Sequence, residues 1–389
     1  MKRKLFLLFT LASALILGCS DDDKSTTKTT QNDPNEWAQY DNTYLFGSIS
    51  EDAKAVLPVI PGKTLDNLGL MYPNDIVMNQ THAFIVDSGN NTIHRIALDT
   101  LDVEKNFVDL GQNVGPASAY ADQDNLYIVC NMTSQVVKVD LKTQAKSVIL
   151  SADKLISGYN VLKVDNAVIV SDSEYDLSNP SNTKGSLIVI KDDGSINSFD
   201  TETPNPTSIA NIKVGEKQYI VSSNSGIVQY GSNGEMTAPD KSCIQLWALE
   251  ELMGGDTPFV KTHCETNSSV GKISVSDTHL YVGDGVTPKV YSTDITKLPD
   301  FDIWTSAAFG NAKDLGMTIP LVVGSDLAVF NFNADTLTWV RGDKRINLKL
   351  SQTEASKKGP ISAIYDANHK QILVLNSLSG SIDVLKIRN

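Results

Sequence analysis

The chain has 389 residues, a formal net charge of −13 and a hydrophobic content of 41%. This hydrophobic content is ordinary for a globular protein, whereas the acidic balance argues against binding to nucleic acid and against electrostatic docking on anionic lipid. The length is compatible with two domains, but all-β architectures often exceed the usual domain size.

The first residues carry an export signal. A basic stretch at residues 2–4 precedes an apolar run at residues 5–17, which is too short to remain as a membrane-spanning helix. The run ends Leu15-Ile16-Leu17-Gly18-Cys19 and resembles the lipobox of bacterial lipoproteins. The resemblance implies that residues 1–18 are removed and that Cys19 carries lipid, whose buried methylenes contribute roughly 0.8 kcal/mol each. The alternative is an ordinary signal peptide with a chance cysteine.

A polar segment follows the lipidation site. Its low hydrophobicity cannot offset the entropy lost on ordering, so residues 19–36 are predicted to be a flexible tether. The triplet Asp21-Asp22-Asp23 resembles the surface-export signal of Bacteroidetes lipoproteins. The expected location is therefore the outer membrane, with the lipid-anchored chain on the cell surface. The alternative is a merely soluble spacer.

An alternating run at Thr43–Ile49 predicts the first strand. It precedes a series of repeated units, and the last unit, Gly359–Asn389, has room for about three strands of the usual length. We expect the early run to supply the missing outer strand, which would remove an open sheet edge and tie both chain ends together. The alternative is a strand packed elsewhere on the surface.

From residue 72 onwards one phrase recurs: an apolar run, a small polar turn and a second alternating run. Seven copies, 41–62 residues apart, are centred on Phe84, Tyr127, Val168, Tyr219, Tyr281, Ala328 and Leu373. Each follows a segment marked by Gly, Pro or small polar residues that begins near residue 72, 115, 158, 205, 269, 318 or 359. Units of this size match the four-stranded blade of a β-propeller. The prediction is one all-β, seven-bladed β-propeller over residues 37–389.

Two of the copies resemble a known repeat. Tyr127-Ile128-Val129-Cys130-Asn131, followed by Val137-Lys138-Val139-Asp140, resembles the YVTN-type, or surface-layer-like, propeller repeat. Asn376 with Ile382-Asp383-Val384 is similar. The resemblance covers residues 72–389 and implies the fold, but a propeller is a scaffold that serves many functions. Together with the lipobox, it extends to propeller lipoproteins of Bacteroidetes, some of which bind cobalamin.

Three cysteines follow the lipidated one. Cys243 and Cys264 lie in two alternating segments on either side of a Gly-Gly-Asp turn. Antiparallel pairing about that turn would place the two residues opposite each other, and an oxidising compartment would then favour a disulfide. The alternative is a pair of buried thiols. Cys130 stands in mid-strand and is predicted to be a small core residue.

The second-to-third-strand loops of units three and four, Ser171–Gly185 and Ser222–Ser242, are the longest. In a propeller they share a face with the segments that open each unit, and together they can wall a pocket at the channel mouth. The candidate ligand-binding residues there are Asn74, Tyr159, Asn160, Tyr175, Asn179, Asn205 and Asn224. Aromatic faces with amides suit a sugar, a peptide or a planar cofactor. The alternative is decorated loops without a ligand.

Motifs for metal binding and catalysis are weak. Asp172, Glu174 and Asp176 alternate as in a calcium loop, but the Gly and distal Glu of an EF-hand are missing. A divalent metal such as calcium is therefore only a weak expectation, and no other cofactor and no catalytic residue is predicted. Propeller lactonases hold a channel metal with a Glu and several Asn or Asp. Here the early units offer only amides, at Asn74, Asn160 and Asn205.

Three functions from different classes remain open. The first is a non-catalytic binding module for a small molecule or a protein partner, such as an outer-membrane transporter in nutrient capture. The second is a metal-dependent propeller lactonase or lyase. The third is a structural or assembly protein of the envelope, which a broad apolar face would mark. The lipid anchor and the tether favour the first, as a monomer held at a membrane.

Overall fold

The computed structural model describes residues 37–388 except 174–183, 231–235, 240, 256–257, 259 and 311–315. Cys19, the signal peptide and the tether lie outside the described residues and stay predictions. Within the described ranges, no helix is long and apolar enough to cross a membrane.

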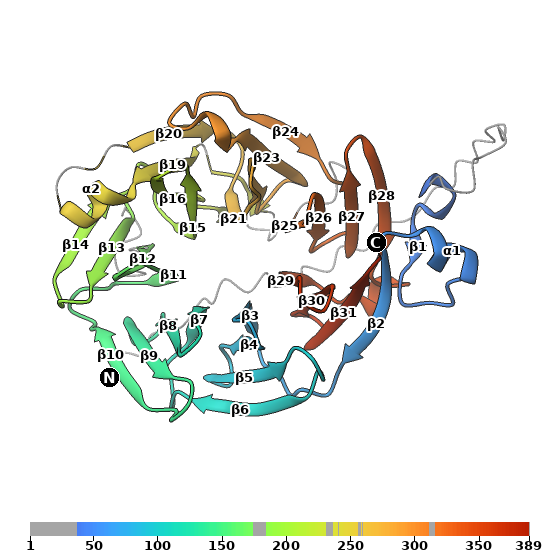
Figure 1. Cartoon of the computed structure of the whole chain (residues 1–389), viewed down its shortest axis with the longest axis horizontal. Coiled ribbons are helices and arrows are strands. Elements are labelled where there is room, and N and C mark those ends of the chain that lie inside the picture. Colours follow the sequence, from blue (N-terminus) through green and yellow to red (C-terminus); the bar gives the residue numbers. More distant parts are fainter. Residues whose placement is uncertain are drawn as a thin grey trace.

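Seven blades of four strands each form a ring (Figure 1), and the short strand β1 (Thr43–Tyr44) adds a fifth strand to the sheet of blade 6. Blade 1 holds β3 (Pro73–Met78), β4 (His82–Asp87), β5 (Thr92–Ala97) and β6 (Val103–Asp109). Blade 2 holds β7 (Pro116–Ala121), β8 (Asn125–Cys130), β9 (Gln135–Asp140) and β10 (Lys146–Leu150). Blade 3 holds β11 (Gly158–Val164), β12 (Ala167–Asp172), β13 (Ser186–Lys191) and β14 (Ile196–Asp200). Blade 4 holds β15 (Pro206–Val214), β16 (Lys217–Asn224), β19 (Ser242–Ala248) and β20 (Val260–Glu265). The short pair β17 (Gln229–Tyr230) and β18 (Met236–Thr237) lies between β16 and β19 in the chain.

The remaining blades complete the ring. Blade 5 holds β21 (Val270–Val275), β22 (His279–Asp284), β23 (Lys289–Asp294) and β24 (Thr305–Ala308), and blade 6 holds β25 (Thr318–Val323), β26 (Asp326–Asn331), β27 (Thr336–Arg341) and β28 (Lys344–Lys349). Blade 7 holds β29 (Pro360–Asp366), β30 (Gln371–Asn376), β31 (Ser381–Ile387) and the N-terminal β2 (Val59–Leu65). The helices are η1 (Trp37–Tyr40), α1 (Glu51–Val56), α2 (Leu249–Gly254), η2 (Ile295–Lys297) and η3 (Glu354–Ser356). The predicted seven-bladed propeller is confirmed.

The core lies between the blades, because each sheet is covered on both faces. In β4, Phe84 and Val86 pack with residues of blade 2, whereas Ile85 packs with residues of blade 7. Second strands therefore read as continuous apolar runs rather than as an alternation, since both sets of side chains are buried. This explains why the recurring apolar run was the clearest marker of each unit.

The N-terminus closes the ring, but with a different strand from the one expected. β2 pairs antiparallel with β31 as the outer strand of blade 7, so the predicted closure by an N-terminal strand is confirmed. The assignment of that role to Thr43–Ile49 was wrong: β1 (Thr43–Tyr44) pairs in parallel with β28 on blade 6. Pro61 and Gly62 interrupt β2 and hide its strand pattern, and an outer strand tolerates them because one of its edges is unpaired.

The cysteines of blade 4 form the expected disulfide. Cys243 stands opposite Cys264 in the β19–β20 pair, and their sulfur atoms are bonded. The prediction of a tight Gly-Gly-Asp turn between the two strands was wrong. The connection includes helix α2, which is capped at its C-terminal end by Gly255 with φ 82°. Cys130 is a buried free cysteine, as predicted. Burial raises the pKa of its thiol to about 12, so the thiol stays protonated.

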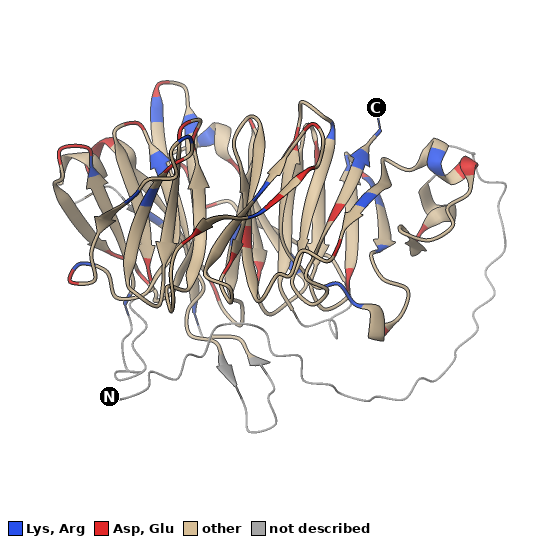
Figure 2. Ribbon diagram, turned by 90° about the horizontal axis from the view of Figure 1, so that it is seen from below, with Lys and Arg blue, Asp and Glu red and all other residues tan. Residues whose placement is uncertain are grey.

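The disc has two faces of different composition, seen edge-on in Figure 2. We call the face where the seven inner strands begin the start face; it carries the connections between blades and the second-to-third-strand loops. Hydrogen bonds join these segments, as where the backbone N–H groups of Val114 and Gly115 both donate to Asn91 Oδ1 at 2.8 Å. The opposite face, which carries the remaining turns of each blade, is the turn face.

Candidate functional site

In six blades the third residue of the inner strand contributes to one ring around the axis of the disc. These residues are Asp75, Ser118, Asn160, Ser208, Lys272 and Ser362. We call them the axial ring. The side chain of Asp75, in blade 1, contacts Ser118 of blade 2, Ser362 of blade 7 and Lys272 of blade 5. Blades 2 and 7 are the neighbours of blade 1, but blade 5 lies across the ring, so the contact with Lys272 requires that both side chains point to the axis.

A repeated irregularity of the backbone builds the ring. In blades 1, 2, 3, 4 and 7 the pairing register shifts between the first and third residues of the inner strand, as between Pro73 and Asp75. Blade 5 shifts between Val270 and Ile273. A β-bulge of this kind leaves one residue unpaired and re-aims its neighbours. The sequence therefore places polar side chains at the axis by the same device in six blades.

Asp75 is the centre of the ring's hydrogen bonds. Its Oδ2 accepts from Ser118 Oγ at 2.6 Å, and its Oδ1 accepts from Ser362 Oγ at 2.7 Å and from Lys272 Nζ at 3.0 Å. The residue is only 5% exposed. A buried carboxylate is tolerated when donors of this kind compensate for lost water. The Asp75–Lys272 ion pair thus links blades 1 and 5 across the axis.

Three of the predicted ligand-binding residues lie at this ring. Asn160 donates from Nδ2 to Ser118 Oγ at 3.2 Å, and Asn74 donates to the carbonyl of Pro116 at 3.4 Å. Burial raises the pKa of the Tyr159 hydroxyl; nearby Lys272 lowers that pKa and Asp75 raises it. Tyr159 is therefore a neutral phenol close to the ion pair. Whether these residues bind a ligand stays a prediction.

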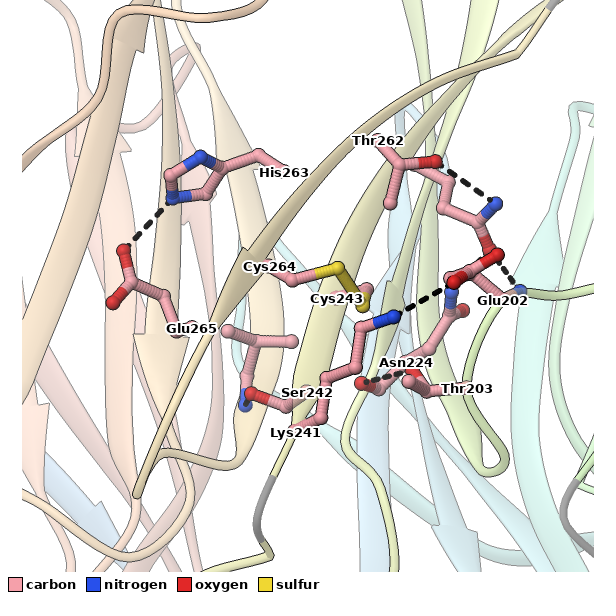
Figure 3. Close-up of a disulfide and its surroundings, with 12 residues drawn as sticks. Glu202, Thr203, Asn224, Lys241, Ser242, Cys243, Thr262, His263, Cys264 and Glu265 are labelled. Atoms are coloured by element: carbon pink, nitrogen blue, oxygen red, sulfur yellow. Dashed lines mark hydrogen bonds and ion pairs between the residues drawn. A yellow bond between two sulfur atoms is a disulfide. The ribbon is translucent and has the colours of Figure 1, made fainter.

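Asn205 and Asn224 lie elsewhere, inside blade 4. Asn205 donates to the carbonyl of Gly226 at 3.1 Å, and the fully buried Asn224 donates to Gln245 Oε1 at 2.6 Å. Figure 3 shows Asn224 beside the Cys243–Cys264 disulfide. Both amides therefore hold the start-face end of blade 4 together and do not join the axial ring. Tyr175 and Asn179 fall outside the described residues.

Of the three acidic residues of the weak calcium motif, Asp172, Glu174 and Asp176, only Asp172 lies among the described residues. Both carboxylate oxygens of Asp172 accept backbone N–H groups, from Ile156 at 2.8 Å and from Ser157 at 2.7 Å. Asp87, the last residue of the second strand in blade 1, likewise accepts from the N–H of Met71. A carboxylate at this position therefore fastens the connection that leads into its blade. Glu174 and Asp176 lie outside the described residues. In the part of the chain that the structure describes, no group of three or more His, Cys, Asp or Glu side chains is placed to hold a metal ion.

Asp75 and Lys272 were missed in the sequence. Asp75 stands beside the chosen Asn74, two residues after Pro73, and aligning the openings on their prolines would have placed it with Ser118, Ser208 and Ser362. Lys272 lies 197 residues further along the chain, so its pairing follows only from closure of the ring.

The fold and the ring define the class: a seven-bladed β-propeller with a polar axis closed by one ion pair. Comparison with protein-family profiles gives no match, and neither does comparison with curated proteins.

Solved structures share the fold. A catalytically inactive virginiamycin B lyase from Staphylococcus aureus, crystallised with quinupristin, matches with a TM-score of 0.59 and 13% identity, over 84% of this chain and 99% of that one. Kuenenia stuttgartiensis hydrazine synthase matches with a TM-score of 0.56 and 13% identity, over 85% and 99%. The WD40 propeller domain of Doa1 matches with 0.56 and 14%, over 85% and 97%. At these identities the likeness concerns the fold alone.

Proposed function

We propose that the chain is a cell-surface lipoprotein whose propeller is a non-catalytic binding module, with its binding site on the start face. The ligand is a small molecule or a protein partner such as an outer-membrane transporter, and nutrient capture is the associated role. The observation that carries the proposal is a set of four uncharged second-to-third-strand loops on the start face of the disc.

Part of the start face is free of charge. Four of its second-to-third-strand loops contain no ionisable side chain: Ser88–Asn91, Asn131–Ser134, Gly285–Pro288 and Ser377–Gly380. Its exposed charges lie on other segments of that face, as at Asp66, Asp153, Lys154, Glu202, Lys241 and Glu354. The turns of the opposite face include the acidic residues Asp99, Asp102, Asp122, Asp124, Asp192, Asp193 and Asp277. Charged residues are depleted at the centres of binding interfaces because they hold water strongly, so the four uncharged loops are the part of the start face suited to close contact.

The chemistry of the axial ring supports binding rather than catalysis. A general base must lie within hydrogen-bond reach of the proton that it removes. Asp75 is the carboxylate of the ring, and its oxygens already accept from two hydroxyls, one ammonium and the N–H of Ile76. Because Lys272 and Asp75 carry opposite charges, their ion pair has no net charge. A ligand at this end of the axis therefore meets fixed hydrogen-bonding groups.

The proposed location is supported by the disulfide and the export signal. Disulfides persist in oxidising compartments outside the cytoplasm, and Cys243 and Cys264 are bonded. The lipobox at Cys19 and the tether to residue 36 would then hold the propeller at the outer membrane.

A thermal-shift screen of the full-length protein in detergent tests the proposal. The panel contains neutral and acidic oligosaccharides, peptides, planar cofactors and divalent ions, because any ligand of the folded state raises the melting temperature by mass action. We expect at least one compound to raise it, and Asn160→Asp to abolish the shift. The matched control Asn166→Asp lies in an exposed turn of the turn face and should leave the shift intact.

The opposite pattern, loss of the shift in Asn166→Asp only, would place the site on the turn face and contradict the proposal. The absence of any shift across the panel would contradict its small-molecule half.

A further inference from the structure

Tyr72 has a backbone conformation that its residue type disfavours. Its φ is 54°, in the left-handed region, where a bulky L-residue costs about 1–2 kcal/mol. The residues that precede the first proline of blades 2, 4 and 7 have the same conformation, and they are Gly115, Asn205 and Gly359, with φ of 59°, 63° and 66°. Glycine and asparagine adopt it readily. Tyr72 is thus the one of these four equivalent residues that is strained.

The surrounding structure enforces this strain. The N–H of Met71 donates to both oxygens of the buried Asp87, at 3.0 and 3.2 Å. The backbone carbonyl of Met71 accepts from the N–H of Gly89 at 2.7 Å. The phenol ring of Tyr72 gains little packing in return, because the residue is 54% exposed. A strained residue whose side chain contributes little to the core is a candidate for direct contact with a ligand.

Tyr72 follows another exposed apolar side chain, since Met71 is 49% exposed. The connection that carries both residues touches the second-to-third-strand loop of blade 7: a methyl group added to Gly380 would lie 3.6 Å from the carbonyl oxygen of Leu70. We call Met71 and Tyr72 the rim platform. It lies at the start-face end of the junction between blades 7 and 1.

A pocket opens next to the rim platform. It has a volume of about 350 Å³ and is lined by Leu68, Gly69, Asn90, Thr92, His94, Lys105 and Asn106. This volume is within the range of ligand pockets. Asp87 joins the pocket to the platform, since its carboxylate accepts from Asn90 Nδ2 at 2.7 Å and from the N–H of Met71 at 3.0 Å. The one lysine of the lining donates to the carbonyl of Asn67 at 2.6 Å.

We infer that the rim platform and this pocket form a subsite for an uncharged oligosaccharide; the inference rests on the proposed function and names its ligand class. A sugar ring offers an apolar C–H face for Tyr72 and hydroxyl groups for the amide of Asn106 and for the side-chain oxygen of Asn90, whose Nδ2 already donates to Gly69 and Asp87. A cationic ligand would find no carboxylate in the lining of the pocket, and the ammonium of Lys105 in that lining already donates to the carbonyl of Asn67. The formal charge of −13 further disfavours an anionic ligand.

Calorimetric titration of the full-length protein in detergent tests the inference. The probes are neutral hexasaccharides of glucose, mannose and xylose, an acidic hexagalacturonate and an uncharged hexapeptide. Tyr72→Gly should weaken binding of a neutral glycan at least tenfold without lowering the melting temperature, because glycine relieves the left-handed strain. The control Gln144→Gly changes an exposed turn-face residue with φ 59°. Its melting temperature should respond in the same way and its binding should not change.

Four results would overturn the inference. Unchanged glycan binding by Tyr72→Gly, tighter binding of hexagalacturonate than of every neutral glycan, or binding of the peptide alone would each do so and leave the proposed binding module standing. A melting temperature that falls only in Tyr72→Gly would assign Tyr72 to packing. Failure of the small-molecule half of the proposed function differs from all four, since no probe of the wider panel would then bind.

Discussion

A carboxylate at the centre of a closed ring of strands loses most of its water, which is unfavourable unless hydrogen bonds replace it. Asp75 is tolerated because hydroxyl groups from both neighbouring blades and an ammonium from blade 5 all donate to it. The side chain of Lys272 is 25% exposed and that of Asp75 is 7% exposed, so the pair lies between a buried and a surface ion pair. Its coupling should therefore exceed that of a surface pair.

A double-mutant cycle measures this coupling. Lys272→Met should lower the free energy of unfolding by about 1–3 kcal/mol, because Asp75 keeps its hydroxyl donors but loses its cation. Asp75→Asn with Lys272→Met should cost less than the sum of the two single changes, with a coupling of at least about 1 kcal/mol in urea denaturation. The exposed pair Lys241–Glu202 is the control, and its coupling should stay near or below about 0.5 kcal/mol. Additive effects at Asp75 and Lys272 would contradict a stabilising pair.

The residues of the ring could be predicted only in part. Asn74, Tyr159 and Asn160 were found because the segments that open units 1 and 3 display polar residues directly before an apolar run. Asn205 has the same sequence context, but it donates to Gly226 within its own blade. Which of these side chains reaches the axis depends on the bulge and on the loop beside it, and the residue types alone do not specify either.

At the scale of the strand, closure of the ring depends on β2. Val59 is fully buried in the cluster that also contains Leu385 of β31 and Ile372 of β30. Val59→Ala should lower the free energy of unfolding by about 1–3 kcal/mol in urea denaturation, since it removes buried methyl groups and leaves a cavity. Thr43→Ala on the two-residue strand β1 should change it by no more than about 0.5 kcal/mol. An equal loss in both variants would argue that β1 contributes as much to closure as β2.

The disulfide constrains a single pair of strands. It closes a loop of 21 residues between β19 and β20, and a loop of this length corresponds to about 3 kcal/mol of stabilisation. Replacing both cysteines by alanine should lower the free energy of unfolding by that amount. Reduction of the wild-type protein with dithiothreitol should lower the melting temperature, whereas the double variant should not respond. A response of the double variant would attribute the effect to another group.

The strand starts were the most predictable elements, for a physical reason. Each inner strand follows a connection that must turn back to the axis, and Gly or Pro marks that turn at Gly115-Pro116, Asn205-Pro206 and Gly359-Pro360. β2 escaped prediction because Pro61 and Gly62 break its alternation. Helix α2 escaped because six residues, Leu249–Gly254, are too few to display a helical period.

At the scale of the whole molecule, the two ends of the described chain meet at the edge of the disc. β2 pairs with the C-terminal β31, and η1, β1 and α1 lie outside the ring beside blades 6 and 7 (Figure 1). A tether that joins at Trp37 would thus attach to the edge and leave the start face open. A flexible chain of 18 residues has a root-mean-square span of about 23 Å, which is enough to let the disc reorient above a membrane.

The proposed lipid anchor and surface export predict separate effects for two parts of the N-terminal segment. Cys19→Ser should move the protein from the membrane fraction to the soluble fraction, because the lipid can no longer be attached. Replacing Asp21, Asp22 and Asp23 by alanine should leave it in the membrane fraction but protect it from protease added to intact cells, since the lipid anchor remains and only surface export is lost. Immunoblots of cell fractions and of protease-treated cells distinguish the two effects.

The control is Asp192→Ala with Asp193→Ala, which removes neighbouring acidic groups from an exposed turn of the turn face. This variant should remain both membrane-bound and accessible to protease, because the position of the acidic residues next to the lipid, rather than the total charge, is expected to direct surface export. If the triplet variant also remains accessible, the acidic run is only a spacer. If the Cys19 variant stays with the membrane, the anchor lies elsewhere, and the start face would then have to be oriented by a protein contact instead of a flexible tether.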